Sequence, residues 1–214
     1  MGAPLVAQTN KELIYSALKN KILNGQLQGG QQIRVAEIAK AYHVSGTPVR
    51  EALIQLDGEG YISYAPYRGA VVRNLSKQDV KEIFLIRSVL ECLALDMALR
   101  RMTKEKYEIA LGLAEQGIHE EDPTKLSAIN WDFHSYMYQQ AELPKLYQII
   151  DSLRAPIVRY VRIYHQMVDR EHHHSTHKEI VLAGMAGDRD RAVSLLRESL
   201  ANACDRISYF IADE

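Results

Sequence analysis

Residues 44–53, with the sequence VSGTPVREAL, constrain the fold more than any other part of this 214-residue chain. Ser45 or Thr47 can cap the first backbone N–H groups of a helix, and Pro48 suits a first helical turn because no N–H is needed there. The apolar residues that follow recur at helical spacing: Val49, Leu53 and Leu56. The segment therefore predicts a tight turn that opens a short helix, with Arg50 pointing outward near the helix start.

The flanking residues predict two more helices and a β-hairpin. Apolar residues recur at helical spacing over 10–24 and 35–42, and glycines mark the loop between them. Two short runs typical of β-strands, 61–65 and 70–73, flank a turn that contains Gly69. Three helices followed by a hairpin form a winged helix-turn-helix, a fold that presents the first turn of its third helix to the DNA major groove.

Candidate DNA contacts lie at the start of the third helix and at the hairpin tip. Arg50 would meet a phosphate or a guanine edge, and an ion pair with a neighbouring acidic side chain is the alternative. Arg68 could enter a minor groove or bind phosphate, and Gly69 would allow a close approach of the backbone. The whole set that we expect at the DNA is Arg34, Ser45, Thr47, Pro48, Arg50, Arg68 and Gly69.

The charge of the chain is distributed unevenly. Residues 1–75 hold eight Lys/Arg and five Asp/Glu, whereas residues 76–214 hold eighteen and twenty-two. A mildly basic first third joined to an acidic remainder fits a small DNA-binding domain on a separate body. No long apolar stretch or charged leader occurs, and Cys92 and Cys204 lie far apart. We therefore expect a cytoplasmic protein with reduced cysteines and no membrane contact.

Residues 76–214 predict an all-helical body. Ser76 caps a helix that extends to residue 99, and Asp79 completes a capping box. This helix is apolar nearly all round, so we expect the core of the body on one side and a second subunit on the other. Arg87 and Glu91, four residues apart, are expected to pair. Further helices are expected over 104–119, 125–141, 145–168 with a kink at Pro156, 172–186 and 189–211.

The N-terminal third resembles the GntR family of bacterial transcription regulators. The residues that carry the resemblance are Ile14, Ile22, Gly25, Ile38, Ala39, the segment 44–53, Leu56, Gly60, Arg68 and Gly69. The family usually has an arginine directly after the turn serine, where this chain has Gly46, and Arg34 could compensate in part. The resemblance implies a protein that binds a double-stranded DNA operator.

The body is similar to the FCD ligand-sensing domain of one branch of that family. The residues that carry this similarity are Ile86, Arg87, Leu90, Glu91, Asn130, Phe133, His134, Leu143, Pro144, Leu146, His177, Ile180, Gly187, Asp188 and Ala192. The implied fold is mainly α, with a winged helix-turn-helix over 1–75 and an all-helical effector-binding and dimerisation domain over 76–214. The implied function is a ligand-responsive homodimeric repressor of a metabolic operon, not an enzyme. A metabolite- or partner-binding protein with weakened DNA binding is the alternative.

The similarity also implies an effector pocket. Metal-binding members of the family have an acidic residue where this chain has Asn130 and a histidine where it has Ser199. Three interpretations stay open: a divalent metal such as zinc or nickel on Asn130, His134 and His177, an organic ligand without metal, or two core histidines. An organic acid is the expected effector, because guanidinium groups pair with carboxylates. The candidate effector contacts are Arg87, Asn130, His134, Arg159, His177 and Ser199, and Tyr136, Tyr138, Tyr160 and Tyr164 could line the cavity or pack in the core.

Overall fold

The computed structural model describes residues 9–65, 69–120, 122–167 and 170–211. The chain divides into two compact units, Met1–Leu75 and Ser76–Glu214. Each unit buries a core of its own, and each is described separately below. None of the described helices combines the length and the apolar composition that a membrane crossing requires.

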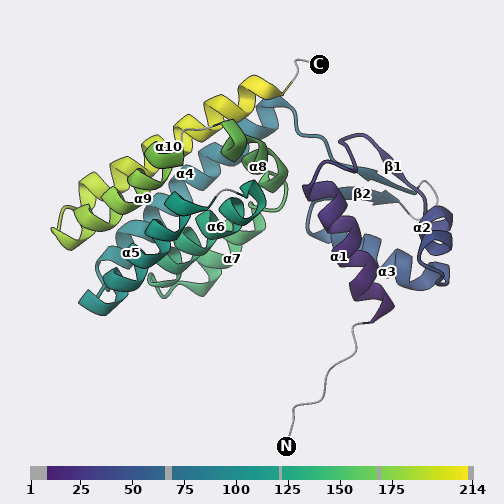
Figure 1. The fold of residues 1–214 in the computed structure, drawn as a ribbon, viewed down its shortest axis with the longest axis horizontal. Helices are drawn as coiled ribbons and strands as arrows, with labels where there is room; N and C mark the ends of the chain where they lie inside the picture. Colours follow the sequence, from purple (N-terminus) through teal and green to yellow (C-terminus); the bar gives the residue numbers. More distant parts are fainter. Residues whose placement is uncertain (1–8, 66–68, 121, 168–169, 212–214) are drawn as a thin grey trace, which may run out of the picture. The chain divides into compact units, whose positions relative to one another are not determined.

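The N-terminal unit contains three helices and a small antiparallel sheet (Figure 1). Its elements are α1 (Asn10–Leu23), β1 (Gln32–Ile33), α2 (Val35–Ala41), α3 (Gly46–Gly58), β2 (Ile62–Ala65) and β3 (Gly69–Val72). The strands are arranged in the order β1-β3-β2, with Ile62 opposite Val72 and Gln32 opposite Val71. The winged helix-turn-helix that the sequence predicts is therefore confirmed. The two-residue strand β1 was not predicted, because it is too short to show an alternating pattern.

The core of the N-terminal unit lies between α1, α3 and the sheet. Its buried apolar side chains are Ile14, Leu18, Ile22, Ile33, Val49, Ala52, Leu53, Leu56, Tyr61, Ile62, Ala70 and Val72. A capping box between Thr9 and Glu12 fixes the start of α1. Leu13 on the same helix is 47% exposed, whereas Ile14 and Leu18 are buried, and α1 packs on α3.

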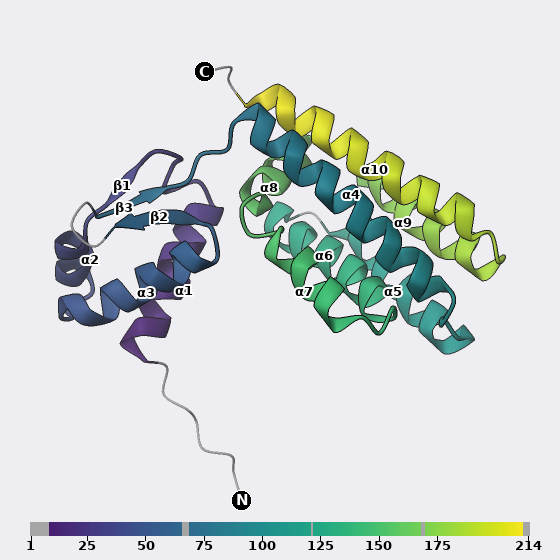
Figure 2. The same ribbon diagram turned by 180° about the vertical axis from the view of Figure 1, so that it is seen from behind.

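The C-terminal unit is a bundle of seven described helices with no described strand (Figures 1 and 2). They are α4 (Lys77–Leu99), α5 (Lys104–His119), α6 (Pro123–Gln139), α7 (Pro144–Ser152), α8 (Val158–Met167), α9 (Arg170–Met185) and α10 (Arg189–Phe210). Helix α10 packs on α4 and α9, and α5 packs on α9 and α6. The predicted cap at Ser76 is confirmed, and Thr103 caps α5 in the same way, since each hydroxyl accepts a backbone N–H of the first turn.

The single long helix predicted over 145–168 is wrong, because the segment forms two helices. Helix α7 ends at Ser152 and α8 begins at Val158, with Pro156 between them. Proline has no N–H to donate, and its ring clashes with the carbonyl group four residues earlier, so it interrupts a helix rather than only bending it. The amides of Ile157 and Val158 both donate to the carbonyl oxygen of Arg154 and form the turn that replaces the missing helical bonds.

Candidate functional site

Helix α3 begins at Gly46, within the segment 44–53 that predicts a turn followed by a helix. Ser45 occupies the N-cap position with extended backbone (φ −71°, ψ 166°), but its side chain makes no capping hydrogen bond. Thr47 is the second helical residue and cannot occupy the cap position, so the predicted side-chain cap by either residue is wrong. Pro48 lies within the first turn, as predicted, where a missing N–H costs nothing. The exposed hydroxyls of Ser45 and Thr47 therefore remain at the surface of this turn.

Arg50 lies on the exposed side of α3, folded back toward the start of the helix. A Cβ placed on Gly46 would lie 3.1 Å from Nη1 and 3.4 Å from Cζ of Arg50, so the guanidinium covers the Cα of Gly46. Within the described ranges, Arg50 forms no hydrogen bond or ion pair, so the alternative of an ion pair with a neighbouring acid is not found. The charge is available to an external anion.

The other candidate DNA contacts differ in their intramolecular interactions and in backbone conformation. Arg34 pairs with Glu37 at 3.3 Å, and both side chains are 65% exposed, so this pair contributes little and can open. Gly69 begins β3 with φ +83°, a conformation that L side chains rarely adopt. Arg68 lies outside the described residues.

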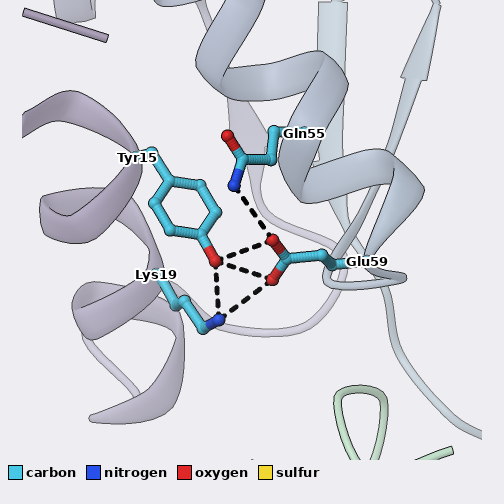
Figure 3. A network of polar contacts seen from close by, with 4 residues as sticks. All are labelled: Tyr15, Lys19, Gln55 and Glu59. Atoms are coloured by element: carbon cyan, nitrogen blue, oxygen red, sulfur yellow. Dashed lines mark hydrogen bonds and ion pairs between the residues drawn. The ribbon is translucent and has the colours of Figure 1, made fainter. Parts of the chain in front are cut away.

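A polar network that the sequence analysis missed joins α1 to the end of α3 (Figure 3). The hydroxyl group of Tyr15 donates a hydrogen bond to the carboxylate of Glu59 at 2.7 Å. Nζ of Lys19 donates to the hydroxyl oxygen of Tyr15 at 2.6 Å and to Glu59 at 2.9 Å. The side-chain amide of Gln55 donates to Glu59 at 3.2 Å. The only signal in the sequence is the spacing of four residues within each pair, Tyr15 with Lys19 and Gln55 with Glu59. The network fixes the C-terminal end of α3 against α1 and so orients the helix that carries Arg50.

The network also shifts the pKa values of its members. Burial alone would raise the pKa of Glu59, but hydrogen bonds from Tyr15, Lys19 and Gln55 outweigh burial and lower it. Burial alone would lower the pKa of Lys19, but its bonds to Tyr15 and Glu59 outweigh burial and raise it. Both groups are therefore charged at neutral pH, which is the state in which the network is complete.

The C-terminal unit contains a cavity of about 40 Å³ between α4, α6, α8 and α10. Its lining includes four of the predicted effector contacts, Arg87, Asn130, His134 and Ser199. The remaining lining residues are Phe84, Val161, Tyr164, Leu200 and Ala203. Residues separated by more than 100 positions in the chain thus meet around one small, partly polar space.

The two other predicted effector contacts lie outside this lining. The guanidinium of Arg159 lies over the ring of Tyr160 at 4.5 Å and donates to its hydroxyl group. His177 is buried beside the cavity, with its ring 4.8 Å from that of His134 and stacked on Phe133 at 4.4 Å. His177 therefore contacts the site through His134 rather than lining it.

A buried polar chain leads from the cavity into the core. Nε of Arg87 donates to Oε1 of Glu91 at 2.6 Å, which confirms the predicted pair, and the side chains are only 12% and 1% exposed. The hydroxyl group of Tyr138 donates to Oε2 of Glu91 at 2.6 Å and lies 3.1 Å from Nδ1 of His134. Burial and the charge of Glu91 raise the pKa of Tyr138 well above its ordinary value, so this hydroxyl keeps its proton.

The direction of these hydrogen bonds fixes the tautomer of His134. A carboxylate only accepts, so the single proton of the Tyr138 hydroxyl goes to Glu91. The contact with His134 then requires Nδ1 to carry a proton and to donate to the oxygen of Tyr138. Glu91 thus orients the imidazole ring through Tyr138 and holds Arg87 at the same time.

The residues around the cavity do not fit a divalent metal ion. The described residues contain no group of three or more His, Cys, Asp or Glu side chains that could hold such an ion. Asn130 and Ser199 offer only neutral oxygens, and both oxygens of Glu91 are engaged by Arg87 and Tyr138. Zinc and nickel sites are built from imidazole, thiolate and carboxylate ligands.

Comparisons with known proteins cover both units. Residues 10–72 match the bacterial regulatory proteins of the gntR family, and residues 82–202 match the FCD domain. The HTH-type transcriptional repressor RspR of Escherichia coli is 28% identical over 174 residues, which are 77% of this chain and 76% of the relative. The HTH-type transcriptional repressor GlaR of Escherichia coli is 26% identical over 202 residues, which are 87% and 90% of the two chains.

A solved structure has the same fold. The structure of Escherichia coli McbR/YncC superimposes with a TM-score of 0.76 at 22% identity and covers 94% of this chain and 98% of its own. The winged helix-turn-helix, the helical bundle and the two family matches agree with one another. The chain belongs to the GntR family of DNA-binding transcriptional regulators and carries a C-terminal FCD domain.

Proposed function

We propose that this regulator is a homodimeric repressor, acting in the cytoplasm, whose operator binding is altered when a small carboxylate effector occupies the cavity of the C-terminal unit. Its N-terminal unit reads each half of a two-fold symmetric operator through the first turn of α3. Residues 76–214 supply the effector site and the subunit contact.

The proposal rests on the exposure of Arg50 and on the absence of an intramolecular partner for it among the described residues. This arginine is exposed on the N-terminal half of α3 and has no hydrogen bond or ion pair in the described part of the chain. In winged helix-turn-helix proteins this part of the third helix meets base edges and phosphates. An unengaged guanidinium at that place is what a contact to guanine or phosphate needs.

A stripe of exposed apolar side chains on α4 supports the subunit contact. Leu85, Val89 and Leu93 are 67%, 63% and 48% exposed and lie four residues apart on one side of the helix. Ile86, 39% exposed, widens the stripe. A contiguous exposed apolar surface of this kind is typical of an interface, and a second copy of the chain covers the same stripe in a two-fold dimer.

Repression is supported by the relatives. RspR and GlaR are both named as transcriptional repressors, and they align with most of this chain. Effector control requires that the ligand binds two states of the dimer with different affinities. Couplings between effector and DNA are about 1–3 kcal/mol, so occupancy of the cavity is expected to change operator affinity about 5- to 150-fold.

Selection of bound fragments from genomic DNA by the purified full-length chain tests the proposal. We expect enrichment of fragments with a two-fold symmetric sequence, and we expect Arg50→Ala to weaken binding to the enriched fragment by roughly 1–3 kcal/mol. Glu51→Ala on the same helix is the matched control. Phosphates repel a carboxylate, so its removal should not weaken DNA binding. A chain that binds enriched and random duplexes equally well would overturn the proposal.

A further inference from the structure

We propose that the cavity of the C-terminal unit binds the carboxylate group of its effector directly on Arg87, without a divalent metal ion. This inference rests on the proposed function, since it names the chemistry by which the same cavity takes its ligand. It concerns the residues Phe84, Arg87, Asn130, His134 and Ser199, which line the cavity, and Glu91 behind them.

The lining of the cavity, which holds a guanidinium and no carboxylate, favours an anion over a divalent cation. Arg87 brings a positive charge to the lining, and Glu91, which neutralises it, has both carboxylate oxygens engaged. The other polar lining groups are an amide, an imidazole and two hydroxyls. A divalent cation placed here would be desolvated beside a guanidinium with no carboxylate or thiolate ligand to offset its charge.

The guanidinium of Arg87 is held in a way that leaves donors for a ligand. Only its Nε donates to Glu91, and Cζ lies 4.9 Å from the centre of the Phe84 ring, so the plane is fixed from two sides. Among the described residues, no other hydrogen bond of this guanidinium is found. The N–H groups on Nη1 and Nη2 are therefore available, and a guanidinium edge matches the two oxygens of a carboxylate.

The size of the cavity also fits a carboxylate. A group of the size of a water molecule needs about 10–15 Å³ of cavity volume, so the 40 Å³ cavity has room for about three such groups. A carboxylate has one carbon and two oxygens. Asn130 and Ser199 reach the same space from α6 and α10 and can donate hydrogen bonds to those oxygens.

The test uses the full-length chain, purified without chelators, and needs no DNA. Metal content is measured by mass spectrometry, and thermal unfolding is recorded with acetate, malonate, inorganic phosphate, zinc chloride or nickel chloride, each with and without EDTA. We expect far less than one metal ion per chain. We also expect a rise in Tm with acetate or malonate that EDTA does not reduce, and no rise with either metal.

Two variants and a control tie the response to Arg87. The double variant Arg87→Met/Glu91→Gln removes both charges together. The variant Arg87→Lys keeps the positive charge but loses the planar guanidinium group. If the double variant does not fold, Arg87→Lys still tests the inference. Both are expected to lose the rise in Tm. Arg100→Met/Asp96→Asn removes a pair at the C-terminal end of α4, with 2.7 Å between its atoms and side chains 53% and 31% exposed, together with the contact of Asp96 with Arg189, and should respond like the wild type.

Five results would overturn the inference: one bound metal ion per chain, a carboxylate response that EDTA abolishes, a response to phosphate but to neither carboxylate, an undiminished response in both Arg87 variants, or no response to acetate and malonate. Because DNA takes no part in these measurements, such a failure is distinct from a failure of the chain to select an operator.

Discussion

The guanidinium of Arg50 lies across the Cα of Gly46, so close that a Cβ on residue 46 would be 3.1 Å from Nη1. A contact this short would require the guanidinium to shift by a few tenths of an ångström, so the missing side chain allows Arg50 its present position. The family usually has an arginine in the position of Gly46. In this chain Arg50 is the one arginine on the first two turns of α3, residues 46–52.

Substitution of Gly46 by alanine is expected to change operator affinity several-fold without loss of stability. The added methyl group would shift the guanidinium of Arg50 by a few tenths of an ångström from its folded-back position, whereas alanine itself favours a helix over glycine. Fluorescence anisotropy with the selected operator measures the affinity. Gly58→Ala is the control, because nothing lies within 4 Å of its added methyl group on the same helix. Equal effects of the two substitutions would show that Gly46 does not position Arg50.

The network around Glu59 predicts a dependence of stability on pH. The pKa of Glu59 is lowered in the folded chain, so its stabilising contribution is complete above the ordinary glutamate pKa of about 4.3 and is lost as the pH falls through the lower folded value. Glu59→Gln is expected to cost about 1–2 kcal/mol at pH 7 and progressively less below about pH 4. Urea unfolding at several pH values measures the difference.

Glu51→Gln is the matched control for this experiment. Glu51 is exposed on the same helix and forms no interaction within the described residues, so its substitution should leave the free energy of unfolding nearly unchanged at every pH. A cost for Glu59→Gln that stays constant down to pH 3 would contradict the assignment.

Removal of the Tyr138 hydroxyl group should destabilise the C-terminal unit. Tyr138→Phe leaves Oε2 of Glu91 and Nδ1 of His134 without this partner in the core, and each buried polar group left unsatisfied costs about 1–3 kcal/mol. Tyr136→Phe removes only a 3.2 Å bond from a half-buried hydroxyl to the carbonyl of Lys106 and should cost less. Chemical denaturation compares the two variants, and a larger loss for Tyr136→Phe would refute the buried polar chain.

Two glycines of the bundle should respond to alanine in opposite directions. A Cβ on Gly184 would lie 2.7 Å from Cδ2 of Leu99 and 3.0 Å from the Tyr107 ring, so Gly184→Ala overpacks the junction of α4, α5 and α9 and is expected to cost about 1–3 kcal/mol. A Cβ on Gly112 meets nothing within 4 Å on α5, so Gly112→Ala should stabilise the chain by up to about 1 kcal/mol. Thermal unfolding of both variants decides; a stabilising Gly184→Ala would mean that these helices pack less closely.

Local rules account for the parts of the structure that the sequence predicted. The capping box at Ser76 and the ion pair of Arg87 with Glu91 depend on residues three and four positions apart, so the sequence alone was sufficient. The helix boundaries of α5, α6, α9 and α10 were predicted within two residues for the same reason.

The features that were not predicted depend on distant contacts. Strand β1 exists only because it pairs with β3, and its paired residues lie 37 and 39 positions further along the chain. The bond from Tyr15 to Glu59 spans 44 residues and that from Tyr138 to Glu91 spans 47. The resemblance to the FCD domain brought Arg87, Asn130, His134 and Ser199 into one hypothesis, but it could not show that Arg159 lies over Tyr160 instead of lining the cavity.

The most direct test of the central claim, that the first turn of α3 meets duplex DNA, is the salt dependence of operator binding by the wild type and by Arg50→Ala. The account predicts sequence-selective binding whose logarithm falls linearly with the logarithm of salt concentration, with a slope that becomes about one unit shallower in the variant if Arg50 meets a phosphate. If Arg50 meets a guanine edge, the slope stays and the preference for that base pair is lost. Binding that is indifferent to sequence, with the same affinity and slope in both proteins, would contradict it.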